Sequence, residues 1–416
     1  MSRIDVRTLT CGLTLIVEHI PSVRSAGLMW LLPAGSASDP EPLQGRSTMW
    51  EHLLLRGAGG LDSREQADAF DALGASKGTE TYTFNLAVSS TMLGSRLPDA
   101  LPLLADMVLR PRFDEASIEP VRDLCLQSIE SLADDPQERV SILLKEKHAP
   151  APLNRSGMGT VEGLEALDRD ALVEGWRERA RPEGAVLAVA GAATMDDLAP
   201  RMDRLLQGWS GRAPDLAAQR PAPRGAHHET DETNQVHIAL AYDAPAEPSA
   251  DAPLERVVNA VLSGGMSGRL FTEVREKRSL CYSVYSSYAT ERDFGRVVAY
   301  AGTTPERAQQ TLDVMLGELR RINGSVNKGG GVEKSEFERA VTGLKSRIVM
   351  SGESTDARAA ALAADWRRLG RPRSLADLSA EVDSVTRGAV NDYLERRSLG
   401  RMTLATIGPA ALTAEL

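Results

Sequence analysis

Residues 48–52, Thr-Met-Trp-Glu-His, have the types and spacing of a zinc-hydrolase helix in which one ligand is replaced. In the pattern H-x-x-E-H, two histidines one helical turn apart bind zinc, and the glutamate between them polarises a metal-bound water. Here Thr48 stands at the first histidine position, while Glu51 and His52 keep theirs. A hydroxyl is a poor ligand for zinc, which prefers imidazole, thiolate or carboxylate groups. The pattern therefore indicates a hydrolytic site from which the chemistry has been removed.

The composition is that of an ordinary globular protein with room for two cores. The chain has 416 residues, 42% hydrophobic and 25% charged, with a formal net charge of -10, which argues against nucleic acid or an anionic membrane as partner. Cys11, Cys125 and Cys281 are scattered and lack C-x-x-C spacing, so a disulfide framework or a cysteine zinc site is not expected. Without an apolar leader or a run of about 18 apolar residues, a cytoplasmic location is expected.

The hydrophobic pattern around the motif predicts two halves with the same order of elements. A helix near residues 43–56 carries the motif and follows a buried strand at 26–34. Short apolar segments at 184–191 and 401–408 are predicted as the last strand of each half. A stretch rich in Gly, Pro, Arg and Ala lies between the halves and lacks a periodic apolar face. We therefore expect domains at residues 1–212 and 231–416, joined by a linker at residues 213–230.

Taken together, these segments resemble the insulinase/pitrilysin family of zinc peptidases, in its short bacterial form related to the mitochondrial processing peptidases. The resemblance covers nearly the whole chain. It is carried by residues 45–57, Gly-Arg-Ser-Thr-Met-Trp-Glu-His-Leu-Leu-Leu-Arg-Gly, and in the second half by residues 267–285 and 300–306. The implied fold class is α+β, with two homologous α/β-roll domains, each a mainly antiparallel sheet packed with helices.

The resemblance also implies a third zinc ligand, a glutamate on a later helix of the first domain. By the pattern of that helix, the ligand position falls at Ser128, and a supporting acidic position falls at Val121. Gln127 or Glu130 could be proposed for the ligand instead. Neither restores the site, because Thr48 has already replaced a histidine. The resemblance thus implies that Glu51 and His52 are vestigial and that this chain holds no metal.

In the second half, Arg275 and Tyr282 keep the spacing of the family's substrate-binding pair. The resemblance implies that they bind the peptide beside the bond to be cleaved. A guanidinium donates forked hydrogen bonds to peptide carbonyls, and a phenol supports a tetrahedral oxyanion. The alternative is structural, with Arg275 in a surface salt bridge and Tyr282 in a strand core.

The first half lacks zinc ligands, whereas the second half keeps Arg275 and Tyr282. This contrast suggests that two different chains together form one active site. The resemblance implies a heterodimeric metallopeptidase in which a homologous partner with an intact H-x-x-E-H motif supplies the zinc. The alternatives are an inactive scaffold or peptide-binding module and, third, a self-sufficient peptidase with an altered ligand set. The short Gly264–Gly268 loop, at the place of a long glycine-rich recognition loop in some relatives, argues against a presequence-recognition role.

Other candidate residues are predicted to be structural. His227, His228 and Glu229 are expected in a solvated loop, and His237 is expected to begin a strand. The chain has no G-x-S-x-G motif and no P-loop lysine in its Gly-rich segment, so serine hydrolysis and nucleotide binding are not indicated.

Overall fold

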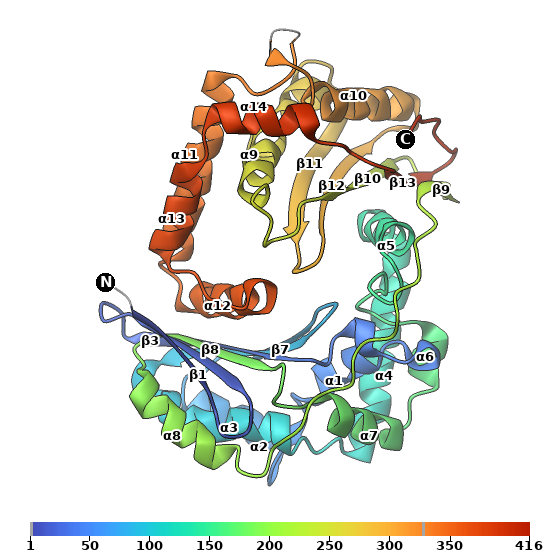
Figure 1. Ribbon diagram of the computed structural model, residues 1–416. Coiled ribbons are helices and arrows are strands. Elements are labelled where there is room, and N and C mark those ends of the chain that lie inside the picture. Colours follow the sequence, from blue (N-terminus) through green and yellow to red (C-terminus); the bar gives the residue numbers. More distant parts are fainter. Residues whose placement is uncertain (1–2, 327–328) are drawn as a thin grey trace. The chain divides into compact units, whose positions relative to one another are not determined.

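The computed structural model describes residues 3–326 and 329–416, and they form two compact units, each built around one sheet (Figure 1). Neither unit is a continuous stretch of the chain, so the units differ from the expected division at residues 213–230. The first unit consists of Met1–Ser131, Ala151–Arg220 and Ser351–Ser374, and the second consists of Leu132–Pro150, Pro221–Met350 and Leu375–Leu416.

The first unit contains a six-stranded sheet in the order β1-β2-β8-β3-β7-β6. Its strands are β1 (Arg3–Thr8), β2 (Thr14–His19), β3 (Ser25–Leu32), β6 (Gly78–Thr81), β7 (Leu86–Leu93) and β8 (Val186–Gly191). The strand β8 is apolar along its whole length because it lies between two strands and both of its faces are buried. A small hairpin, β4 (Gly57–Ala58) with β5 (Leu61–Asp62), is separate from this sheet.

Helices of the first unit surround this sheet. They are α1 (Arg46–Leu53), α2 (Ser63–Ala72), α3 (Leu97–Leu109), α4 (Glu115–Glu130), α6 (Val161–Glu165), α7 (Arg169–Arg179), α8 (Met195–Leu205) and α12 (Thr355–Leu369). In the described residues of both units, no helix combines the length and the apolarity needed to cross a membrane.

The second unit contains a five-stranded sheet in the order β11-β12-β10-β13-β9. Its strands are β9 (Gly225–Thr230), β10 (Val236–Ala244), β11 (Cys281–Thr290), β12 (Gly295–Thr303) and β13 (Thr403–Gly408). Its helices are α5 (Pro136–His148), α9 (Ala252–Ser263), α10 (Ala308–Arg321), α11 (Lys334–Ser351), α13 (Leu375–Ser384) and α14 (Arg387–Arg396). The strand β9 lies within residues that were expected to be a linker.

The two sheets share one strand order. The series β6-β7-β3-β8-β2 matches β11-β12-β10-β13-β9 strand by strand, and in each series only the last pair is parallel. The internal repeat predicted from the sequence is therefore visible in the topology. Each unit contains an edge hairpin, a central strand and a parallel pair in the same arrangement.

Each sheet has one face covered by a helix from the sequence half that builds the other sheet. In the first unit, α12 lies along β3 and β8 (Figure 1), and Ala359, Leu362 and Ala363 pack on the sheet. The start of α12 is capped by the Ser354 hydroxyl, and its end by Gly370 at a φ of 69°. In the second unit, α5 packs on β10 and β13 in the same way. The exchange explains why neither unit is continuous.

Candidate functional site

The helix α1 carries residues 48–52, and its first turn is fixed by the buried Asp39. The Asp39 carboxylate accepts hydrogen bonds from the Gly45 N–H at 3.1 Å, the Ser47 N–H at 3.1 Å and the Ser47 hydroxyl at 3.0 Å. The guanidinium of Arg46 lies 4.0 Å away. These donors favour a carboxylate at the positive end of the helix, but burial is the larger effect and raises the pKa of Asp39 to about 6.

The same helix is hydrogen-bonded sideways to the edge strand β6. The Glu51 carboxylate accepts a hydrogen bond from the Thr81 N–H at 2.7 Å, and the Glu51 carbonyl accepts one from the Thr79 hydroxyl at 2.7 Å. The Thr81 hydroxyl donates to the Ser47 carbonyl at 3.1 Å. Glu51 lies at the position of a catalytic base, but here its carboxylate and its carbonyl are hydrogen-bonded to the edge strand β6.

Thr48 and His52 lie one turn apart on α1 and so share a face of the helix. The Thr48 hydroxyl donates a hydrogen bond to the Gly157 carbonyl. The His52 side chain is partly buried and has no hydrogen-bond partner among the described residues. Relative to the H-x-x-E-H pattern, this face carries a hydroxyl in place of the first imidazole, and that hydroxyl is hydrogen-bonded to a carbonyl of the same unit.

The helix α4 packs against α1 and carries the position predicted for the third ligand. The Ser128 hydroxyl donates to the Leu124 carbonyl one turn earlier, at 2.9 Å, and Val121 is fully buried in the core. Gln127 and Glu130 are exposed. Neither Ser128 nor Val121 supplies the carboxylate that a zinc site would need at this helix.

Cys125 lies three residues before Ser128 on α4. Burial raises the pKa of its thiol to about 12, and the Glu51 carboxylate adds to this shift. The thiol therefore stays protonated at neutral pH and behaves as a small apolar core residue.

The residues of the first unit do not fit a zinc ion. Within residues 3–326 and 329–416, no group of three His, Cys, Asp or Glu side chains is placed so that it could hold a metal. Thr48 and Ser128 offer neutral hydroxyls that are already hydrogen-bonded to backbone carbonyls. A structural or catalytic zinc site needs at least three good ligands, and here His52 has no partner of that kind.

In the second unit, Arg275 lies on a short π-helix, Phe271–Glu276. The Lys277 N–H donates to the Thr272 carbonyl, five residues back, at 2.9 Å. The turn then ends at Ser279, whose φ of 51° lies in the left-handed region that side chains rarely adopt. Because a π-turn inserts one extra residue, it redirects the side chains around it, and such turns are frequent at functional sites.

The guanidinium of Arg275 lies against two aromatic rings. Its central carbon is 4.9 Å from the ring centre of Phe271 and 4.8 Å from that of Tyr282. In the part of the chain that the structure describes, Arg275 has no carboxylate partner and no side-chain hydrogen bond. Ring stacking fixes the plane of the guanidinium while leaving its N–H groups available to a ligand.

Tyr282 is presented by a β-bulge at the start of β11. The pairing of β11 with β12 shifts between Cys281 and Ser283, so Tyr282 is the extra residue of the strand. A bulge redirects a side chain away from the regular alternation, and the Tyr282 side chain is 83% exposed. The structural alternatives do not hold, since Arg275 has no salt bridge among the described residues and Tyr282 is not in a core.

The thiol beside this pair is not a nucleophile. Burial raises the pKa of Cys281 to about 11, and Arg275 lowers it only in part. The chemistry available here is therefore hydrogen-bond donation from Arg275 and Tyr282, without a thiolate.

The histidines at positions 227, 228 and 237 lie on strands of the second sheet, and the last two have side-chain partners there. His227 and His228 lie on β9 and not in a solvated loop, and the His228 Nδ1 is 2.9 Å from the Thr406 hydroxyl. Glu229 pairs with Arg139 of α5 at 3.3 Å. His237 lies on β10, as expected, with its Nδ1 2.8 Å from the Tyr300 hydroxyl.

Two residues that shape these sites were not predicted from the sequence. Phe271 precedes Arg275 by four positions, and this aromatic–arginine spacing was a usable signal. Asp39 lies six residues before Gly45, the N-cap of α1, which is beyond the range of local capping patterns, so no signal in the sequence identified it.

Comparisons with known proteins cover both halves of the chain. The family described as "Insulinase (Peptidase family M16)" matches residues 14–161. The domain described as "Peptidase M16 inactive domain" matches residues 166–344.

Curated relatives match over almost the full length. An uncharacterized zinc protease of Streptomyces coelicolor is 30% identical, covering 97% of this chain and 89% of the relative. Similar proteins of Mycobacterium leprae (28% identical, 97% of this chain, 91% of the relative) and Bacillus subtilis (26%, 97% and 98%) carry the same description.

Solved structures show the same fold. A structure from Pseudomonas fluorescens, described as a peptidase M16 inactive domain, has a TM-score of 0.86 at 20% identity and full coverage of both chains. A protease from Helicobacter pylori has a TM-score of 0.87 at 16% identity, covering 98% of this chain and 100% of the other. Family matches to both halves, full-length relatives and a shared fold lead to one conclusion: the chain belongs to the insulinase family of peptidases, family M16.

Proposed function

We propose that this chain is the substrate-binding, non-catalytic subunit of a heterodimeric zinc metallopeptidase. One contrast within the chain carries the proposal. At the metal site, within the described residues, only His52 keeps an unbonded ligand, since the Thr48 hydroxyl donates to a carbonyl and the Glu51 carboxylate accepts the Thr81 N–H. Arg275 and Tyr282, in contrast, are stacked and available to a ligand. In this proposal the chain holds no cofactor, and the zinc belongs to a homologous partner with an intact H-x-x-E-H motif.

Arg275 and Tyr282 would act on the peptide that the partner hydrolyses. The flat guanidinium of Arg275 donates two hydrogen bonds to carbonyls of the bound peptide and sets its register. The Tyr282 phenol donates to the oxygen of the reacting carbonyl as negative charge develops on it. Loss of one such donor typically lowers the turnover rate by about 10²–10³-fold.

The test is reconstitution from purified subunits. The chain alone is expected to hydrolyse no peptide, and the mixture with the zinc-bearing partner is expected to gain activity. Arg275→Ala and Tyr282→Phe are expected to lower turnover of the mixture by about 10²-fold or more without changing assembly. Arg292→Ala, an exposed arginine in the β11–β12 turn, is the matched control and should leave turnover unchanged.

Two results would contradict this function. Robust hydrolysis by the lone chain, with stoichiometric zinc in metal analysis, would favour a self-sufficient peptidase with altered ligands. Full activity of the mixture with Arg275→Ala would favour an inactive scaffold or peptide-binding module. A neighbouring gene that encodes an intact H-x-x-E-H motif and a downstream glutamate identifies the partner to use.

We also propose a cytoplasmic location. All three cysteines, Cys11, Cys125 and Cys281, are free thiols, which suits a reducing compartment. Fractionation of the native host, with immunodetection of the chain, tests this location directly.

A further inference from the structure

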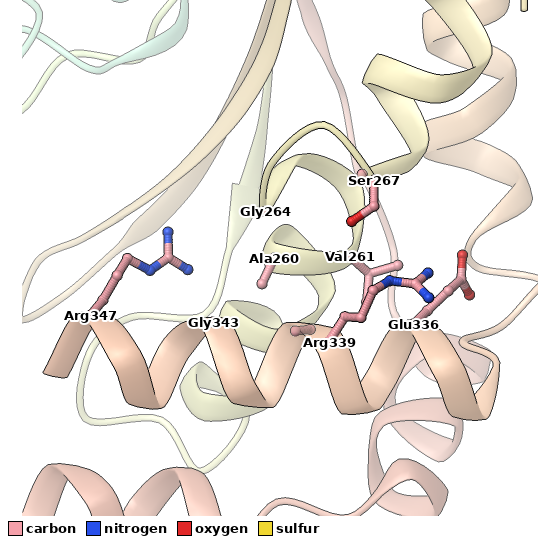
Figure 2. A pocket seen from close by; sticks show the side chains of 10 residues that line it. Ala260, Val261, Gly264, Ser267, Glu336, Arg339, Gly343 and Arg347 are labelled. Carbon is pink, nitrogen blue, oxygen red and sulfur yellow. The ribbon is translucent and has the colours of Figure 1, made fainter. Parts of the chain in front are cut away.

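A groove lies between the Gly264–Gly268 loop and the helix α11 in the second unit (Figure 2). Its volume is about 50 Å³. Its floor is apolar and buried, and its rim carries a hydroxyl and two guanidinium groups. The floor is formed by Ala260, Val261 and Ala340, and the rim by Ser267, Arg339 and Arg347.

The two arginines of the rim carry positive charge that no close contact holds. Arg339 and Arg347 are exposed, and neither makes an ion pair or a hydrogen bond with any residue that the structure describes. The carboxylate in the groove, Glu336, is held by Arg269 through two hydrogen bonds of 2.7 Å each. Glu336 also attracts the charge of Arg339 at longer range. One carboxylate is thus set against the guanidinium groups of Arg269, Arg339 and Arg347, and the groove keeps a net positive charge in a chain whose formal net charge is -10.

The distance between these two arginines along α11 matches a distance along an extended peptide. Arg339, Gly343 and Arg347 are four residues apart on α11 and so follow one face of the helix, with the glycine between the arginines (Figure 2). A Cβ added at Gly343 would meet no atom within 4 Å, so the space there is open. Eight residues of helix span about 12 Å. In an extended peptide, side chains four residues apart are separated by about 13 Å.

We infer that this groove binds an acidic segment of an extended peptide, with carboxylates four residues apart on Arg339 and Arg347. Carboxylates match the forked donors of a guanidinium, and the groove, at about 50 Å³, accepts one small side chain from the segment between them. The inference rests on the proposed function in taking the ligand to be a peptide, and it assigns that peptide an acidic stretch.

The groove continues toward the segment that holds Arg275. A larger hollow of about 590 Å³ shares Ser267, Glu336 and Arg339 with the groove. Its lining also includes Thr272 and Glu276 of the π-helix. The larger hollow thus borders the π-helix that carries Arg275, while Arg275 and Tyr282 are not among its lining residues.

Peptide binding to the full chain alone tests the inference. The probes are fluorescein-labelled peptides of about twelve residues, long enough to span the groove, in a Gly/Ser/Ala background with two glutamates four residues apart. Matched peptides carry two glutamines or two lysines at those positions. Fluorescence anisotropy is expected to show the tightest binding for the glutamate peptide, weakening as salt is added.

Variants at the two arginines and at Gly343 distinguish the effect of charge on peptide binding from the effect of the groove's shape. Arg339→Gln and Arg347→Gln are each expected to weaken binding of the glutamate peptide by about fivefold, in line with loss of one charge-assisted contact. Gly343→Leu should weaken binding by filling the groove without changing charge. The controls are Arg292→Gln and Gly317→Leu, the second being a helical glycine of α10 that also has open space. Both are expected to bind as the unchanged chain does.

Three outcomes would overturn the inference. They are equal binding of the glutamine peptide, undiminished binding by the Arg339→Gln/Arg347→Gln double variant, and a single-stranded DNA oligonucleotide bound more tightly than the glutamate peptide. Since no partner subunit is present in this assay, its result is independent of the reconstitution test. If turnover of the mixture depends on Arg275 but the chain shows no preference for the glutamate peptide, the proposed function stands. Only the inference about the groove is then wrong.

Discussion

Glu51 lies where a catalytic base would be found, but its carboxylate accepts the Thr81 N–H of the edge strand β6. We expect Glu51→Ala to destabilise the fold by about 1–2 kcal/mol, because a partly buried N–H loses its partner. Glu51→Gln keeps an acceptor oxygen and should have little effect. Urea unfolding measures both variants.

The same two variants should leave turnover of the reconstituted mixture unchanged. A general base would instead contribute about 10²–10⁴-fold to the rate. A loss of that size in Glu51→Gln, with unchanged stability, would show that the residue acts in catalysis.

Phe271 is expected to position Arg275. Phe271→Leu removes the ring under the guanidinium, and we expect turnover of the mixture to fall by about tenfold, with Phe271→Tyr restoring it. Separate values of kcat and KM, together with urea unfolding, distinguish this effect from general destabilisation. If Phe271→Tyr were as impaired as Phe271→Leu, ring stacking would not be the cause.

The residues of the two sites could be predicted from the sequence, whereas the backbone structure that presents them could not. Spacing identified Thr48, Glu51 and His52 on one helix, whereas Arg275 and Tyr282 were identified through the resemblance to the insulinase family. The π-turn and the β-bulge that present the second pair arise from backbone pairing with distant residues. Such irregularities leave little trace in local composition, because they depend on strand register.

At the scale of elements, the start of α1 depends on the protonation of Asp39. Its pKa is raised from 3.8 to about 6 in the folded chain. A raised folded-state pKa means that the folded form binds the proton more tightly than the unfolded form does. This contribution to stability is therefore complete below about pH 4 and is lost as the pH rises through about 6.

Asp39→Asn should remove that pH dependence. The free energy of unfolding of the unchanged chain, relative to the variant, is expected to fall between pH 4 and pH 7 by an amount on the order of 2 kcal/mol. Urea titrations of both proteins across this range measure the difference. A relative stability that rises with pH would contradict the direction of the shift.

The helix α12 is attached to the first sheet by a buried ion pair. Arg358 and Glu18 are 2.7 Å apart, with each side chain 1% exposed. Arg358→Met leaves the Glu18 charge buried without a partner, and we expect a loss of about 3–5 kcal/mol in urea unfolding.

The double variant Glu18→Leu/Arg358→Met serves as the control. It removes both charges, so it should recover most of that loss. A double variant as unstable as the single one would assign the effect to packing around α12 and not to the unpaired charge.

Strongly apolar elements could be predicted more reliably than polar ones. The predicted strands at 184–191 and 401–408 agree with β8 and β13 within two residues. The strand β9, Gly-Ala-His-His-Glu-Thr, has no apolar alternation and was taken as linker. It is a strand because β13 offers it a parallel edge, a tertiary effect that overrides composition.

At the scale of the whole molecule, the exchange of α5 and α12 could not be predicted from the sequence. Amphipathic patterns show that a helix has an apolar face but not which sheet that face covers. The family matches confirm the two-part organisation, whereas the helix exchange follows only from the packing of Ala359, Leu362 and Ala363 on the first sheet.

We expect a fragment of residues 1–220 to be incompletely folded by itself. Without α12, the sheet face that includes Ile16, Leu31 and Ala188 is uncovered. The fragment should bind a hydrophobic dye, and a peptide of residues 351–374 added in trans should suppress that signal. A fragment that unfolds cooperatively and binds no dye would show that α12 is dispensable.

One outer strand of each sheet is hydrogen-bonded to a helix side chain. Glu51 holds the Thr81 N–H of β6, and the Asn259 amide lies 3.5 Å from the Ser286 carbonyl of β11. Open strand edges recruit other chains and seed aggregation. With the Glu51 carboxylate bound to one of its N–H groups, β6 is a less open edge, so this protein should remain monodisperse at concentrations where an unguarded edge would begin to form fibrils.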